Sequence, residues 1–145
     1  DHYLAILTGI VLGVLFHTVI LYFLALLFHF QPDIVATLIP KSITTAIAVG
    51  VSENLGGIVP LTVAVVVFTG IFGATFGKEI LRLAGITDPL AQGVALGAAS
   101  HAMGTARAIE LGDLQGAMSA LTIVVTGITV VALAPLTIPI TNLLF

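Results

Sequence analysis

The chain has 145 residues, of which 59% are hydrophobic and 8% are charged, and its mean hydropathy is +1.24. Soluble domains carry roughly a quarter of their residues as charged side chains, so this composition predicts a protein whose solvent is lipid. A formal net charge of −3 with four Lys and Arg residues argues against nucleic acid as a partner. The absence of cysteine excludes disulfides, thiolate chemistry and cysteine-ligated metals.

Residues 3–30 form the first predicted element, an uncharged run longer than the roughly 20 residues that a membrane-spanning helix needs. Gly9 and Gly13 are spaced four residues apart in it, a pattern that lets a neighbouring helix approach closely. His17 and His29 are isolated polar residues in this run, and we expect them to pack or to lie at the membrane interface. The element is therefore predicted to span the membrane and to offer one face to another helix.

The second element, residues 34–51, is interrupted by polar residues in its middle. Pro40 removes a backbone donor there, and Lys41 follows without an acidic residue close to it in sequence. Three hydroxyl side chains come next: Ser42, Thr44 and Thr45. Because a lysine at a helix centre in the bilayer costs on the order of 3 kcal/mol, we expect this segment to be broken or re-entrant.

Two further uninterrupted spans are predicted, at residues 58–77 and 116–136. Between them, residues 78–89 are amphipathic and form a surface segment. The positive charges of Lys78 and Arg82 favour the cytoplasmic side of the membrane for this segment. The last span is followed by an apolar tail that contains proline.

Residues 90–111 form a second interrupted segment, whose apolar beginning is too short to cross the membrane alone. Its polar residues are Ser100, His101, Thr105, Arg107 and Glu110. The chain is therefore predicted to be a single membrane domain, residues 1–145, with an all-α polytopic helical bundle and two interrupted segments.

An offset of 60 residues aligns the two interrupted segments, which predicts an internal repeat. Lys41 then matches His101, and Glu53 matches Asp113. Such paired interruptions are the best sequence indication of a transporter binding site near the bilayer midplane. The sequence leaves open whether the repeats are inverted or parallel.

The free amides at helix breaks favour an anionic ligand, and the polar residues at both breaks suit a carboxylate. We predict a binding site for a small organic anion, formed by Lys41, Ser42, Thr44, Thr45, Ser100, His101, Thr105 and Arg107. Simpler explanations stay open: the threonines can bond a carbonyl one turn back, and an Arg107–Glu110 pair needs no ligand. A further group is predicted to couple ions or to be structural: Glu53, Asn54, Glu110 and Asp113. Of these, Glu53, Asn54 and Asp113 can instead lie in water at loop positions.

Catalysis is the weaker interpretation of these residues. Ser100 and His101 are adjacent, so their side chains project in different directions and form no nucleophile and base pair. The sequence contains no HxxxH, HExxH or GxxxxGK motif. We therefore predict no enzyme activity, no catalytic residue, no metal site and no cofactor.

Residues 38–58, LIPKSITTAIAVGVSENLGGI, and residues 88–121, DPLAQGVALGAASHAMGTARAIELGDLQGAMSAL, resemble the CidB/LrgB family of bacterial membrane proteins. The resemblance implies an antiholin-like or holin-like modulator of murein hydrolase activity and autolysis. Relatives in plastids export glycolate and glycerate, and some bacterial members are linked to pyruvate. The family normally carries a hydrophobic region ahead of the position of Asp1, so we expect this chain to be the C-terminal portion of a longer protein.

From the residues and the resemblance together, we expect transport of a small monocarboxylate such as pyruvate, glycolate or glycerate. The alternative is an antiholin-like or pore-associated subunit that acts through assembly and has no substrate of its own. The expected partners are membrane lipids, a holin-like membrane protein of the LrgA/CidA type, and further copies of the chain as a homo-oligomer. The expected location is the bacterial inner membrane, with the plastid envelope as the second choice.

Overall fold

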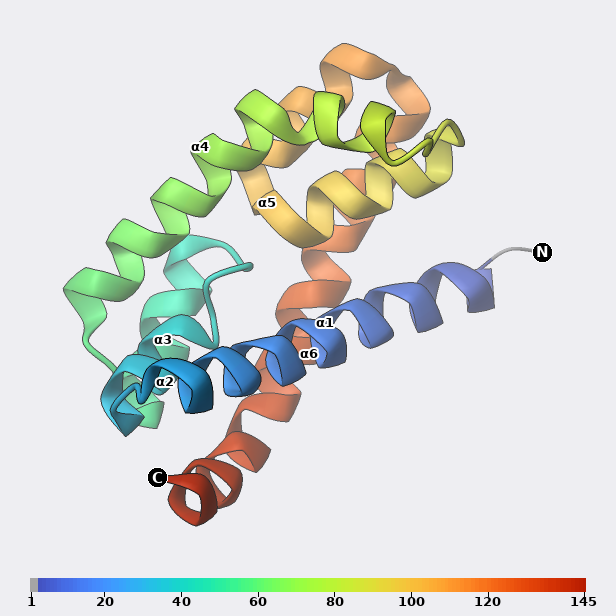
Figure 1. The fold of residues 1–145 in the computed structure, drawn as a ribbon. Helices are drawn as coiled ribbons and strands as arrows, with labels where there is room; N and C mark the ends of the chain where they lie inside the picture. The colour runs from blue at the N-terminus through green and yellow to red at the C-terminus, as the bar shows by residue number, and fades with distance from the viewer. Residues whose placement is uncertain (1–2) are drawn as a thin grey trace.

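The computed structural model describes residues 3–145, which form six α-helices and no strand. In chain order these are α1 (Tyr3–Phe28), α2 (Pro32–Leu38), α3 (Thr45–Leu55), α4 (Val59–Leu83), α5 (Pro89–Leu111) and α6 (Asp113–Leu144). Figure 1 shows their arrangement. The all-helical class predicted from the sequence is confirmed.

Three of these helices, α1, α4 and α6, are long and apolar enough to cross a membrane. They correspond to the three predicted spans, but two of them are longer than expected. The amphipathic residues 78–83 continue α4 instead of forming a separate segment, and α6 continues through Pro135 and Pro139. In an apolar environment a helix is the conformation that satisfies most of the backbone, so two prolines do not end it.

Helices α2 and α3 are separated by residues 39–44, which are not α-helical. Buried hydroxyls attach this pair of short helices to the start of α4. The Thr37 hydroxyl accepts a hydrogen bond from the Ile58 amide at 2.8 Å, and the hydroxyls of Ser52 and Thr62 are 2.6 Å apart. Thr62 also donates to the Thr37 carbonyl oxygen at 3.2 Å. Polar bonds between helices therefore hold a segment whose backbone is interrupted.

Helix α5 folds back on itself at His101, whose backbone is not helical (φ 43°, ψ −133°). In a straight helix, Leu96 and Gly104 would be separated by about 12 Å along the axis. Here a Cβ atom on Gly104 would collide with the Leu96 carbonyl oxygen. The missing side chain of Gly104 thus allows the two halves of α5 to pack against each other, as the bent path of α5 in Figure 1 shows.

The two long helices that follow the short segments run in opposite directions in Figure 1. Helix α4 rises from the lower left to the upper right, whereas α6 descends from the top of the view to the bottom. The most extensive helix contact in the described chain joins α5 to α6. Small residues allow the two helices to approach closely, since a Cβ on Gly97 would lie 2.5 Å from the Ser119 carbonyl oxygen.

This close contact predicts the effect of Gly97→Ala. The added methyl group would meet the α6 backbone and force α5 and α6 apart, which should lower the free energy of unfolding by roughly 1–3 kcal/mol. Gly50→Ala is the matched control, because a Cβ at this helical position meets no atom within 4 Å. That control should be neutral or stabilising by up to about 1 kcal/mol. Unfolding titrations in mixed micelles measure both, and equal effects would contradict the packing described.

Candidate functional site

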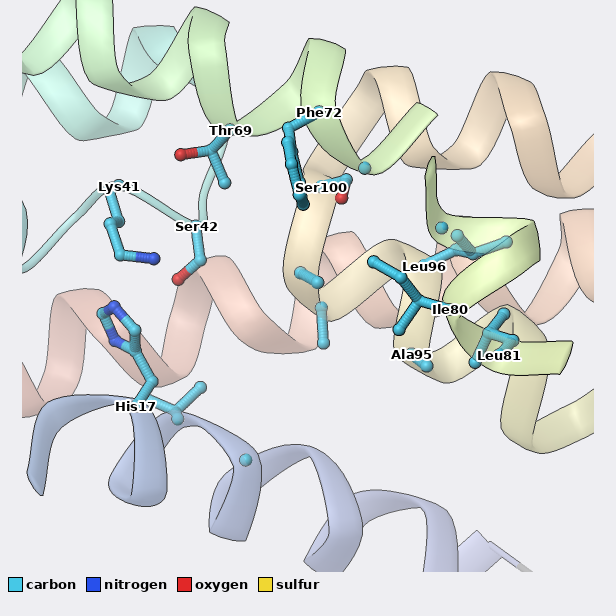
Figure 2. A pocket seen from close by; sticks show the side chains of 16 residues that line it. His17, Lys41, Ser42, Thr69, Phe72, Ile80, Leu81, Ala95, Leu96 and Ser100 are labelled. Atoms are coloured by element: carbon cyan, nitrogen blue, oxygen red, sulfur yellow. The ribbon is translucent and has the colours of Figure 1, made fainter. Parts of the chain in front are cut away.

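A cavity of about 450 Å³ lies among α1, α4, the first half of α5 and the break between α2 and α3. Its walls are mostly apolar, with a few polar side chains that enter from different elements. Figure 2 shows these side chains: His17, Lys41, Ser42, Thr69 and Ser100. A concave, largely apolar pocket with a few convergent polar groups is the usual form of a small-molecule site.

Lys41 brings the only lysine or arginine side chain of the described residues to this cavity. The break at residues 39–44 places it there, because the side chain leaves the backbone between α2 and α3 and is not packed along one continuous helix. Within residues 3–145 the ion pairs are Glu79–Arg82 and Arg107–Glu110, so Lys41 has no carboxylate partner there. Its side chain therefore faces the cavity without an acidic partner, and burial lowers the pKa of its amine, so a bound anion would stabilise its charged form.

His17 lies beside Lys41 in the cavity, and the sequence did not predict this pairing. Figure 2 shows the two side chains pointing toward each other across one end of the cavity. The Nε2 atom of His17 is buried and has no hydrogen-bond partner in the described part of the chain. Its position on α1 was the available signal, because Ile10, Val14 and Leu21 are buried at helical spacing on the same side.

The two interrupted segments both reach this cavity, each through a serine. Ser42 follows Lys41 in the break between α2 and α3, and Ser100 ends the first half of α5. Ser100 packs against Gly73 of α4, where any side chain would collide with it. Thr69 adds a third hydroxyl, which donates to the Val65 carbonyl oxygen one turn back at 2.8 Å.

His101 does not line the cavity, although the neighbouring Ser100 does. Its ring is buried against α4, with Nε2 3.0 Å from the Val66 carbonyl oxygen. Gly70 leaves the room for the ring, because a Cβ at that position would meet the imidazole. The structure thus places His101 as the tip of a bent helix that is anchored on α4.

The remaining predicted hydroxyls also lie outside the cavity. Thr105 donates to the His101 carbonyl oxygen at 3.1 Å, and its hydroxyl is 2.7 Å from that of Ser119. Thr44 precedes α3 as its N-cap without a side-chain capping bond, and Thr45 is the first residue of α3. The simpler explanation offered from the sequence, that a threonine bonds the preceding turn, describes Thr105.

Arg107 is placed away from the cavity and pairs with Glu110 one turn later in α5. The other predicted charged or polar residues lie at exposed positions. Glu53 and Asn54 are exposed near the end of α3, and Asp113 is exposed in the first turn of α6. Among residues 3–145, no three His, Asp or Glu side chains are grouped as metal ligands. The structure thus brings together Lys41, Ser42 and Ser100 from the predicted set.

The model of the LrgB-like family matches residues 1–140. The chain belongs to the LrgB-like family. Two proteins named Holin-like protein CidB, from two strains of Staphylococcus epidermidis, are each 36% identical to it over 140 residues. These matches cover 97% of this chain and 59% of each relative, so the chain spans less than two thirds of their length. No solved structure matches significantly.

The family match confirms the resemblance found in the two sequence blocks. Together with the three helices that are long and apolar enough to cross a membrane, it indicates a bacterial membrane protein.

Access to the cavity predicts a difference between two threonines of α4. Thr69→Cys should react with a small water-soluble methanethiosulfonate, because residue 69 lines the cavity. Thr62→Cys should stay unmodified, because residue 62 is fully buried between helices. The chain has no native cysteine, so mass spectrometry of each single-cysteine variant reads one position. If neither variant is modified, the cavity is closed to water. If both are modified, α4 is misplaced.

Proposed function

We propose that the chain forms the binding site of a carrier for small monocarboxylates such as pyruvate, glycolate or glycerate. The observation that carries this proposal is the uncompensated Lys41, which faces the cavity beside His17 and Ser42. A carboxylate there would gain the lysine charge and the hydroxyl donor of Ser42, with Ser100 of the second interrupted segment farther along the same cavity. The proposal assigns no chemical reaction to the chain.

We further infer an inverted internal repeat, in which α2–α3 with α4 corresponds to α5 with α6. Thr37 and Gly97 are 60 residues apart, and each lies in the first half of its interrupted segment. Thr37 contacts Thr62 of α4, while Gly97 packs on Ser119 of α6. The opposite directions of α4 and α6 in Figure 1 support inversion over parallel repeats. In carriers of this type, substrate binds where the broken helices of the two repeats meet.

Substituting Lys41 by Ala tests the carrier function. Loss of a charge-assisted hydrogen bond worth about 1.5–3 kcal/mol should weaken saturable pyruvate uptake by roughly 10- to 100-fold. Uptake of labelled pyruvate into membrane vesicles measures it, at matched protein abundance. Lys78→Ala is the control, because this lysine is exposed near the end of α4.

Arg107→Ala separates this site from the wider one predicted from the sequence. Because Arg107 pairs with Glu110 and does not line the cavity, uptake should stay close to that of the parent. Parental uptake by Lys41→Ala would overturn the carrier proposal. A loss in Arg107→Ala equal to that in Lys41→Ala would show that the binding site extends beyond the cavity.

A second candidate function is regulation of murein hydrolases and autolysis through assembly, without a substrate. The name of the relatives, Holin-like protein CidB, favours it. So does the face formed by Gly9 and Gly13 on α1, where an added Cβ would meet no atom within 4 Å. This face is suited to a helix of a holin-like partner or of another copy of the chain.

The assembly function predicts that bulky residues on this face matter more than the cavity. Gly9→Leu should abolish co-purification with the partner and change the rate of autolysis, because the helices are held apart. Gly9 is chosen alone because Gly13 also lines the cavity. Lys41→Ala should leave both intact. If autolysis follows Lys41 and is unaffected by Gly9→Leu, assembly through this face is wrong and anion flux accounts for the phenotype.

A further inference from the structure

The cavity is polar at one end and apolar at the other. Figure 2 shows His17, Lys41, Ser42 and Thr69 toward one end, with Phe72 and Ser100 in the middle. The opposite end is formed by hydrocarbon side chains of α4 and α5: Ile80, Leu81, Ala95 and Leu96. A carboxylate held at Lys41 would therefore direct the rest of its molecule toward aliphatic walls.

We propose that the apolar end is a subsite for an aliphatic tail, so that the preferred ligands are monocarboxylates with a hydrocarbon chain. The inference rests on the proposed function, because it takes the anion site at Lys41 as given. A tail that enters the subsite removes apolar surface from water, which strengthens binding by about fourfold for each buried methylene group. Short acids would occupy only the polar end and leave the subsite empty.

The same geometry excludes a second charge. The second carboxylate of a dicarboxylate would lie among Leu81, Ala95 and Leu96, where no positive or donor side chain lines the cavity. An ionised group buried without a partner is strongly disfavoured. A hydroxyl group at the far end of a long tail is disfavoured for the same reason, although less strongly, whereas the hydroxyls of glycolate and glycerate stay near the carboxylate, at the polar end.

Calorimetric titration at pH 7 tests this subsite with the protein in phosphatidylcholine nanodiscs and empty nanodiscs as the blank. The probes are acetate, butyrate and hexanoate, with succinate as a dicarboxylate of the same carbon number as butyrate. Affinity should rise about fourfold per methylene from acetate to butyrate, and succinate should not bind. Equal affinities for acetate and butyrate, as when a lipid chain already fills the subsite, would overturn the inference.

Two substitutions locate the effect in the subsite. Ala95→Leu should fill it and Ile80→Ala should remove part of its wall, so both should lower the ratio of hexanoate to acetate affinity. Ile80 is 49% exposed, so its truncation does not disturb a tightly packed core. Ala102→Leu, at an exposed position of α5 outside the cavity, is the matched control and should keep the parental ratio. An unchanged ratio in both subsite variants would contradict the inference.

Lys41→Ala distinguishes failure of the subsite from failure of the carrier proposal. If it abolishes binding of every acid while the affinity of the parent does not depend on tail length, the anion site stands and the subsite is wrong. If all acids bind Lys41→Ala as they bind the parent, the anion site itself is wrong. The subsite is then wrong as well, because it assumes a carboxylate at Lys41.

Discussion

Inside a bilayer every backbone amide and carbonyl needs a partner within the protein, and this constraint decides where the chain can interrupt its helices. Both interruptions are enclosed. The one at residues 39–44 lies beside α1 and α4, and the one at His101 lies against α4. Each flanking segment is bound to a long helix through buried hydroxyls: Thr37, Ser52 and Thr62 in the first case, Thr105 and Ser119 in the second. These contacts with the long helices stabilise both breaks and so keep the walls of the cavity in place.

The electrostatics of the cavity follow from the same arrangement. A continuous helix of apolar residues could not carry Lys41 without a cost of on the order of 3 kcal/mol. The break allows the side chain to enter a shared space instead, beside His17 from a helix that precedes it in sequence. The charge is thus at once the feature that is hardest to bury and the one that gives the cavity its chemical character.

Much of this fold could be predicted from sequence, because lipid imposes simple rules on composition and length. The all-helical class, the three spans and the polar character of both interrupted segments were predictable for that reason. The grouping of side chains was not. Of the eight predicted anion-binding residues, only Lys41, Ser42 and Ser100 line the cavity. Residue type and spacing do not specify the direction in which a bent helix turns its side chains.

His17 was expected to pack or to lie at the interface because it stands alone in an apolar run. Its Nε2 atom is buried in the structure, but its position beside Lys41 could not be predicted, because the two residues lie on different elements. The resemblance to the family extended over both motif blocks and was confirmed by the match over residues 1–140. It identified the class of protein without locating a binding site, because family membership describes the whole chain and binding depends on a few contacts.

The backbone of His101 has a wider consequence. A residue other than glycine in this conformation costs of order 1–3 kcal/mol and persists only where its surroundings enforce it. The 23 residues of α5 would measure about 35 Å as one straight helix, which exceeds the roughly 30 Å of bilayer hydrocarbon. The imidazole contact with α4, the packing of Gly104 on Leu96 and the close contact with α6 together keep this segment folded back on itself. A segment with the length of a membrane crossing therefore serves as a folded wall of the cavity.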